Sequence, residues 1–150
     1  MDESKAQQLA QVMGDECIAF RVRALNRVIT NLYDAALQPF GITVNQATML
    51  IMLSYVGKAG PGRIGHVLIM EKSTVSRNLK LMKKQGWIKA VEGETGRDQI
   101  VSVTVKGKKL LTAFHPDWEK AQKQAEELLG KQGVTAVHSL HTSVRKAHPV

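Results

Sequence analysis

Residues 71–87 read EKSTVSRNLKLMKKQGW, and this stretch decides the fold that the sequence predicts. Val75, Leu79 and Met82 are four and three residues apart, which is the spacing of one apolar helix face. Ser73 is expected to cap the start of this helix, and Gly86 is expected to end it. The opposite face is basic and rich in hydroxyl groups, with Ser73, Arg77, Lys80 and Lys84 at its centre and Thr74 and Ser76 at its margins. The stretch therefore predicts an amphipathic helix with a basic outward face.

Positive charge is concentrated around this helix. The chain has 150 residues, a formal net charge of +8, and a composition that is 43% hydrophobic and 23% charged, which is typical of one globular domain. Residues 58–109 hold twelve lysines and arginines against four acids, and the remaining nine basic and nine acidic residues cancel. A concentrated positive field attracts polyanions, most often nucleic acid. A solvated basic face is the alternative interpretation.

The segments before the basic helix also have helical patterns. Residues 5–39 carry apolar side chains in two rows at helical spacing, which predicts a single helix with two apolar faces. Thr43 and Gln46 have the spacing of a capping box, which predicts the start of the next helix. A short apolar segment, 64–70, lies between that helix and the basic one. Two short helices are therefore expected before the basic helix.

Two strands and two more helices are predicted after it. Residues 88–92 and 100–105 read as strands on either side of a turn rich in glycine and acidic residues. Pro116 is expected to kink the following helix or to start a new one, because proline lacks the amide hydrogen that a helix interior needs. A last helix is predicted over 134–146. The fold class is mainly α with a small β-hairpin wing, in the order of a winged helix-turn-helix.

A glycine-rich stretch, GPGRIG at residues 60–65, has the spacing of a dinucleotide-binding loop. Such a loop needs a strand before it and an acid about twenty residues later, but here a helix precedes it and Lys80 or Gln85 lies at that distance. We interpret it as the turn into the second helix of the helix-turn-helix. A nucleotide-binding enzyme is the alternative, and it rests on this stretch alone. The sequence contains no catalytic triad pattern, P-loop or metalloprotease motif, so we expect neither enzymatic activity nor a cofactor.

From residue 41 to about residue 111, the sequence resembles the multiple antibiotic resistance regulator (MarR) family of bacterial transcription factors. The similarity rests on three motifs: GITVNQATML at 41–50, STVSRNLKLMKKQGWI at 73–88 and GRDQIVSVTVKGKKLL at 96–111. RVRALNRVITNLYDAAL at 21–37 is also similar to the first helix of one large branch of the family. The resemblance implies a homodimer that binds a pseudo-palindromic operator in double-stranded DNA and acts as a repressor. Within this single MarR-like domain, 1–40 and 108–150 would form the dimerisation region and 41–107 the winged-helix DNA-binding lobe.

The resemblance also implies which side chains meet DNA. Arg97 would enter the minor groove from the tip of the wing, although a solvated hairpin arginine is the alternative. Thr95 stands where the family usually has an aspartate that braces this arginine, and Asp98 is a candidate substitute. Arg63 would touch the DNA backbone at the edge of the site. The predicted DNA-binding set is Arg63, Lys72, Ser73, Thr74, Ser76, Arg77, Lys80, Lys84 and Arg97.

The resemblance further implies how the regulator is released from DNA. The family has a pocket between the DNA-binding lobe and the dimerisation helices that is often receptive to phenolic or aromatic compounds. A small aromatic ligand bound there would weaken operator binding. A branch of the family senses hydroperoxides through a cysteine in its first helix, so Cys17 is a candidate redox site. The alternative is that Cys17 is a small buried apolar residue.

Other partners and sites are not expected. His138 and His141 are three residues apart, but neither has a carboxylate or thiol near it in sequence, so no metal site is predicted. The N-terminus is acidic and polar, and the longest apolar stretch, 47–53, is too short to span a bilayer. A single cysteine excludes an intrachain disulfide and fits a reducing compartment. We therefore expect a cytoplasmic protein with no membrane partner.

Overall fold

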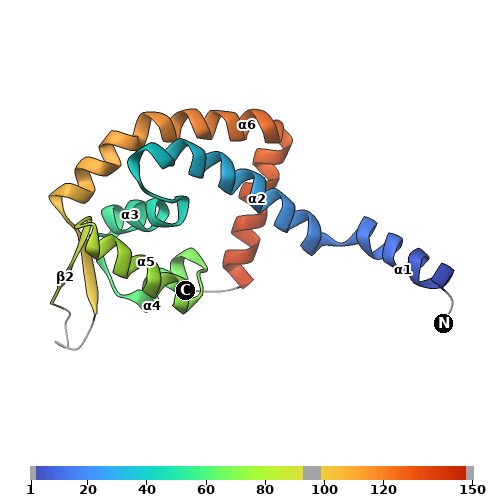
Figure 1. Cartoon of the computed structure of the whole chain (residues 1–150), viewed down its shortest axis with the longest axis horizontal. Helices are drawn as coiled ribbons and strands as arrows, with labels where there is room; N and C mark the ends of the chain where they lie inside the picture. The colour runs from blue at the N-terminus through green and yellow to red at the C-terminus, as the bar shows by residue number, and fades with distance from the viewer. Residues whose placement is uncertain (1–2, 93–98, 148–150) are drawn as a thin grey trace.

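The structure, a computed structural model, describes residues 3–92 and 99–147, and most of its elements are helices (Figure 1). In chain order the elements are α1 (Glu3–Glu16), α2 (Ile18–Leu37), the 3-10 helix η1 (Gln38–Phe40), α3 (Val44–Val56), β1 (Lys58–Ala59), α4 (Pro61–Leu68), α5 (Lys72–Lys84), β2 (Ile88–Val91), β3 (Ile100–Val103) and α6 (Val105–Ala147). The strands form one antiparallel sheet in the order β1–β3–β2. This architecture confirms the predicted fold class and adds β1, whose two residues are too few to show a strand pattern.

The hydrophobic core lies among α3, α4, α5 and the sheet, and it extends to the end of α2 and the first part of α6. Its largest fully buried side chains are Phe114, Leu37, Met49, Leu50, Leu53, Ile64, Met82, Val75 and Val101. They come from every one of these elements, so burying them fixes the orientation of α5 against the sheet. The core thereby determines which face of α5 is left in solvent.

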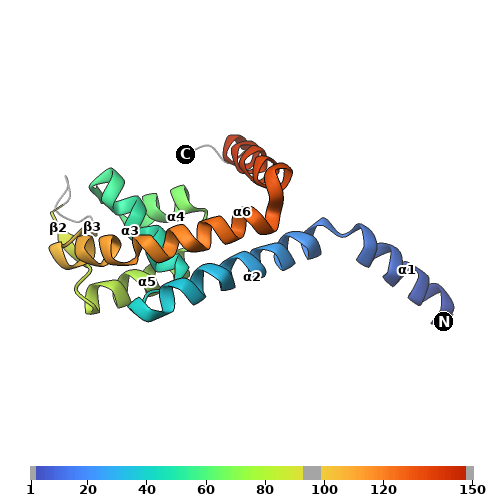
Figure 2. The same ribbon diagram turned by 90° about the horizontal axis from the view of Figure 1, so that it is seen from above.

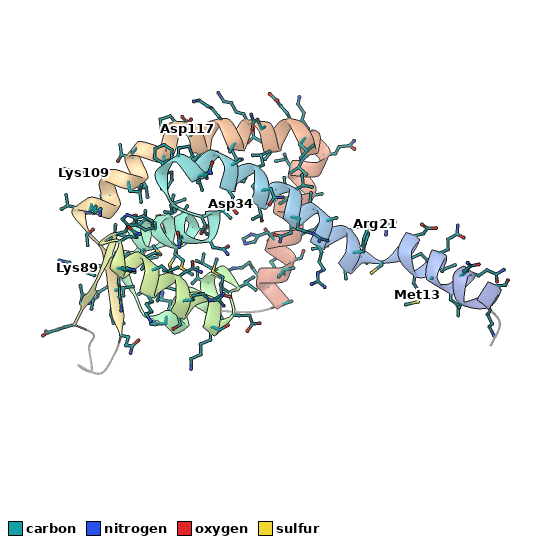
Figure 3. The ribbon with its side chains drawn as sticks, in the orientation of Figure 1. Met13, Arg21, Asp34, Lys89, Lys109 and Asp117 are labelled. Atoms are coloured by element: carbon teal, nitrogen blue, oxygen red, sulfur yellow. The ribbon has the colours of Figure 1, made fainter. Side chains whose placement is uncertain are left out.

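The start of α3 is fixed by two sets of hydrogen bonds. Thr43 Oγ1 accepts from the amide of Gln46, and Gln46 Oε1 accepts from the amide of Thr43, which confirms the predicted capping box. The amide of Val44 donates to Asp34 Oδ1 at 2.6 Å, and Asp34 is labelled on α2 in Figure 3. This bond ties α2 to the first turn of α3 and so joins the long helices to the helix-turn-helix.

The long helices α2 and α6 run lengthwise beside each other in both ribbon views (Figures 1 and 2). Tyr33 of α2 donates its phenolic hydrogen to Gln122 Oε1 of α6, and the Tyr33 ring centre lies 6.4 Å from that of Trp118. Burial, with a smaller contribution from the negative charge of Glu126, raises the pKa of Tyr33 above 10.0. The α2–α6 contact is therefore partly polar as well as aromatic.

The prediction of one helix over 5–39 is wrong, because the chain leaves the helical conformation at Cys17. Cys17 has φ −66° and ψ 106°, and its Sγ accepts a hydrogen bond from the amide of Phe20 at the start of α2. The Arg21 guanidinium donates hydrogen bonds to the carbonyls of Cys17 and Asp15, and these bonds stabilise the break between α1 and α2. Arg21 is labelled in Figure 3. As a result α1 extends away from the rest of the chain (Figure 2).

The C-terminal region is also interrupted at a residue other than the one predicted. Helical backbone angles continue through Pro116, whereas Gly130 has φ 65° and ψ 169°, where α6 turns sharply (Figure 1). Glycine has no Cβ and so adopts these angles at little steric cost. The segment after Gly130 returns toward α4, where Arg145 donates a hydrogen bond to the carbonyl of Val67. Among the described residues, no helix has both the length and the apolar character needed to cross a bilayer.

Candidate nucleic-acid interface

Helices α4 and α5 are joined by a tight turn. Ile69 ends α4 in the left-handed region with φ 52°, and the amide of Met70 donates to the carbonyl of Gly65 at 2.8 Å. A Cβ on Gly65 would lie 3.0 Å from the carbonyl oxygen of Met70, so glycine permits this close approach. A β-branched residue in the left-handed region is strained, and such strain is often found at functional sites. The turn makes α4 and α5 a helix-turn-helix pair.

Helix α5 begins one residue before the predicted cap. Its N-cap is Glu71, whose carbonyl accepts from the amide of Val75, and no side chain caps the helix. The prediction that Ser73 is the cap is therefore wrong, because the left-handed turn at Ile69 brings the chain into helical conformation at Lys72. The consequence is that Ser73 lies within the first turn of α5 with its side chain exposed.

The two faces of α5 have the predicted character. Val75, Leu79 and Met82 are 1%, 4% and 0% exposed. The exposed polar positions are Lys72, Ser73, Ser76, Arg77, Lys80, Lys83 and Lys84, and Thr74 is half-buried. Gly86, with φ 72°, follows the end of the helix as predicted. Because these exposed residues carry amine, guanidinium and hydroxyl groups, the face can donate hydrogen bonds to phosphates and base edges.

Two of the predicted DNA-binding residues, Arg63 and Arg97, do not belong to α5. Arg63 is exposed in α4, which begins at Pro61 behind the N-cap Gly60. The stretch 60–65, interpreted from the sequence as a turn into this helix, is mostly part of the helix itself, because only Gly60 precedes α4, as its N-cap. Arg97, Thr95 and Asp98 lie outside the described residues.

A groove of about 350 Å³ runs along one side of α5. It is lined by Pro61 of α4, by Gln99 just before β3, and by five residues of α5: Lys72, Ser76, Leu79, Lys80 and Lys83. A Cβ on Gly60 would lie 3.3 Å from Ile100 Cδ1, so the absence of a side chain lets the start of α4 approach β3 closely. Lys83 and Gln99 are not in the predicted DNA-binding set, whereas the neighbouring Lys84 is in that set but does not line the groove. Lys83 could have been predicted from its spacing. It follows Lys72 by eleven residues, which places the two lysines on the same side of a helix.

In the described part of the chain, no ion pair neutralises the positive charge on the exposed face of α5. The two pairs there are His115–Glu119, at 3.7 Å, and Lys120–Asp117, at 2.8 Å, and both lie within α6. None of the lysines of α5 is paired with a carboxylate among the described residues. The positive charge of α5 is therefore available to an anionic partner.

A second cavity, of about 420 Å³, lies between α3 and α6. It is lined mainly by apolar and aromatic residues: Ile51, Ser54, Tyr55, Leu111, Phe114, His115 and Trp118. The rings of His115 and Trp118 are stacked with centres 6.2 Å apart. Trp87, by contrast, is in the core and 6% exposed. The cavity thus lies between a helix of the predicted DNA-binding lobe and the long helix of the predicted dimerisation region.

The remaining candidate residues do not assemble into a site of their own. Cys17 is half-exposed at the break between α1 and α2, not buried. His138 and His141 are exposed on the last part of α6. Within residues 3–92 and 99–147, no group of three or more histidine, cysteine, aspartate or glutamate side chains is arranged to hold a metal ion.

Comparison with known proteins identifies the class. No family model matches the chain. YwoH of Bacillus subtilis (strain 168), an uncharacterized HTH-type transcriptional regulator, is 30% identical over 103 residues, which cover 69% of this chain and 73% of that protein.

Solved structures of transcriptional regulators have the same fold. A mutant MarR from E. coli complexed with operator DNA has a TM-score of 0.77 and 18% identity, and the match covers 88% of this chain and 96% of that one. For M. tuberculosis MosR in complex with DNA, the values are 0.75 and 24%, covering 89% and 100%. For a probable transcriptional regulator from Pseudomonas aeruginosa they are 0.76 and 23%, covering 87% and 98%. The chain therefore belongs to the HTH-type transcriptional regulators, a non-enzymatic class, and it has the winged helix-turn-helix fold of the MarR and MosR structures.

Proposed function

We propose that this regulator is a homodimeric repressor that binds a pseudo-palindromic operator through α5 and is released by a small aromatic ligand. The observation that carries the DNA-binding part is the exposed face of α5, where four lysines, one arginine and two serines are left in solvent with no carboxylate partner among the described residues. An α-helix fits the major groove, and arginine and lysine supply contacts to guanine and phosphate. The operator complex of the E. coli MarR mutant and the DNA complex of MosR, which have the same fold, support this assignment.

The predicted contacts divide into three groups by the part of the DNA that they would meet. Arg77 offers a planar fork that can read guanine, and the hydroxyl groups of Ser73, Thr74 and Ser76 lie near it on the helix. Lys72, Lys80, Lys84 and Arg63 would contact phosphates, which sets affinity more than sequence preference. Arg97 would contact the minor groove from the wing. Recognition helices place their N-terminal residues deepest in the groove, so Lys84, the last residue of α5, is expected to contribute least.

Exposed apolar side chains on the long helices support a homodimer. On α2 they are Ile18, Phe20, Val22, Leu25 and Val28, and on α6 they are Leu128, Val137, Leu140 and Val144. Large apolar side chains exposed in such number on two helices favour a protein interface. A second copy covering these helices would give two α5 helices related by a two-fold axis, as a pseudo-palindromic operator requires.

The cavity between α3 and α6 supports release by a small aromatic ligand. Tyr55, Phe114 and Trp118 give it the aromatic lining that favours a flat ring, and His115 could pair with an acidic group on the ligand. A ligand that binds better when α3 and α6 are held at a spacing unsuited to DNA would lower operator affinity by that difference. Trp118→Ala should weaken the ligand's effect on operator affinity while leaving affinity without ligand unchanged.

Gel-shift titration against the DNA upstream of the protein's own gene tests the proposal. We expect strong preference over random duplex and a steep loss of affinity as salt rises, because several phosphate contacts release counterions. Equal affinity for operator and random DNA would contradict a sequence-specific regulator. If no aromatic acid or phenol shifts either operator affinity or melting temperature, the release mechanism is wrong even though the DNA-binding role stands.

Redox sensing through Cys17 is a second candidate for release, and the half-exposed position of this cysteine favours it. Treatment with an organic hydroperoxide would then weaken operator binding of the native protein and leave Cys17→Ser unaffected. An equal response of both proteins would exclude Cys17 as the sensor.

A further inference from the structure

The last part of α6, residues 131–147, returns to the helix-turn-helix and meets it at two points. The guanidinium of Arg145 donates a hydrogen bond to the carbonyl of Val67 in the last turn of α4. Ala147 lines a cavity of about 480 Å³ together with residues of the turn between α4 and α5. In Figure 1 this segment runs back from the far end of α6 toward α4. We call residues 131–147 the C-terminal segment.

The hydrogen bond from Arg145 completes the C-terminal end of α4. Helix α4 ends at Ile69, whose amide donates to the carbonyls of Gly65 and His66. The carbonyl of Val67 is the next along the chain, and it accepts from Arg145. The C-terminal end of a helix carries a partial negative charge, so a cationic side chain that binds its last carbonyls stabilises it. Arg145 is half-buried at this position, whereas the residues on either side of it in the chain are exposed.

The turn beside this contact determines where α5 lies relative to α4. Ile69 is a β-branched residue with φ 52°, and such a strained conformation persists only where neighbouring contacts hold it. Helix α5 begins three residues later, at Lys72, so a change in the backbone angles of Ile69 would reorient the whole of α5. A contact that holds the end of α4 therefore also helps to hold α5.

The break at Gly130 decides whether Arg145 reaches α4. The chain changes direction at this residue, and Arg145 follows it by fifteen residues. At about 1.5 Å of rise per residue this is roughly 22 Å of helix, so a rotation of about 10° at Gly130 would move Arg145 by roughly 4 Å. Such a displacement is enough to break a hydrogen bond. Val137, Leu140 and Val144 are exposed on the same segment, so whatever covers them also fixes the position of Arg145.

We propose that the C-terminal segment is a strap that sets the position of the helix-turn-helix, and that Arg145 is its positioning residue. A second copy that covers the apolar side chains of the strap holds it in place, and Arg145 then holds the end of α4 and the turn into α5. Assembly of the dimer is thereby linked to the preference for an operator. The effect on operator preference rests on the proposed DNA-binding function, whereas the effect on the turn does not.

The test compares Arg145→Ala with Lys146→Ala in the full-length protein. Both variants lose one positive charge, but Arg145 binds the carbonyl of Val67, whereas Lys146 is exposed. We expect Arg145→Ala to lose about threefold to thirtyfold in operator affinity. Its affinity for random duplex should fall less than about twofold, with an unchanged salt slope, because the phosphate contacts of α5 remain.

Two further variants complete this comparison. Lys146→Ala should lose less than about twofold for either DNA. Arg145→Lys should restore part of the operator preference, because it keeps a cationic donor near the end of α4. Equal loss of operator preference in Arg145→Ala and Lys146→Ala would overturn the proposal, as would equal losses of Arg145→Ala on operator and random duplex with a salt slope smaller by about 1. In the latter case Arg145 is a phosphate contact.

Amide hydrogen exchange tests the strap without DNA. The amides of Ile69 and Met70 should exchange at least about threefold faster in Arg145→Ala than in the native protein or Lys146→Ala, because the turn opens more often. Unchanged exchange would overturn the proposal even if the melting temperature falls, since the bond would then add stability without positioning the turn. If the native protein shows no preference for its operator, the proposed function fails, and the exchange comparison still decides whether the strap holds the turn.

Discussion

Arg77 is the residue whose side chain is best suited to recognising the base sequence of an operator. It is exposed in the first half of α5, opposite the buried Val75, Leu79 and Met82. An arginine that contacts guanine through two hydrogen bonds contributes about 1–3 kcal/mol of discrimination. Arg77→Ala should therefore weaken operator binding about tenfold to a hundredfold and relax the preference at one base pair of each half-site.

The matched variant is Lys80→Ala, three residues later on the same face. Its affinity should fall for all sequences equally, because phosphate contacts carry no sequence information. Both variants should remain as associated as the native protein in sedimentation. Dissociation of either one would mean that α5 belongs to a protein interface.

Gly107 shows how a single glycine can be required by close contact. A Cβ at this position would lie 2.2 Å from the carbonyl oxygen of Trp87 and 2.7 Å from Val103 Cγ1. Gly107→Ala should therefore lower the free energy of unfolding by at least about 1–3 kcal/mol, as overpacking does. Gly62→Ala is the control, because no atom lies within 4 Å of its Cβ and alanine favours a helix. Urea denaturation measures both, and equal stability of the two variants would contradict the contact.

At the scale of elements, the contact between α2 and α6 makes stability depend on pH through Tyr33. Its raised pKa means that the folded chain holds the phenolic proton more tightly than the unfolded chain does. The stabilisation is complete below the unfolded pKa of about 10 and is lost as pH rises through the higher folded pKa. Melting temperature should thus fall in alkaline solution, in addition to any general loss from other groups.

Two tyrosine variants isolate this effect. Tyr33→Phe should melt at a lower temperature at neutral pH, because it loses the hydrogen bond to Gln122, and should show a smaller alkaline loss. Tyr55→Phe is the control, because Tyr55 is 93% exposed. If both variants keep the full alkaline loss, Tyr33 is not its source.

The helices and the hairpin of the predicted DNA-binding lobe could be predicted because they depend on local signals. The capping box at Thr43 and Gln46, the apolar face of α5 and the glycine after it are each contained within a few residues. The sequence did not allow us to predict that the helices break at Cys17 and Gly130 or that α5 starts at Lys72. At these points the sequence allows more than one conformation, and contacts such as those of Arg21 or the turn at Ile69 select one.

At the scale of the whole molecule, the apolar surface of α2 predicts that the isolated chain is not the functional form. Leu25→Glu places a charge in this surface and should convert the proposed dimer to a monomer, with more than about tenfold loss of operator affinity because two half-sites are no longer bound together. Asn45→Glu adds the same charge at an exposed position of α3, outside the predicted dimerisation region, and should stay dimeric. Sedimentation of native protein as a monomer at micromolar concentration would contradict the proposed dimer.

The sequence by itself determined the class of fold, the basic face of α5 and the class of regulator, because each depends on side-chain periodicity or on motifs of adjacent residues. Only the tertiary structure decided which lysines share a groove, since Lys72 and Lys83 meet Gln99 only after the sheet packs beside α5. The same is true of the cavity between α3 and α6, whose lining residues are as far apart as Ile51 and Trp118. Local pattern specifies which face of a helix is polar, but the docking of elements distant in the chain specifies what that face encloses.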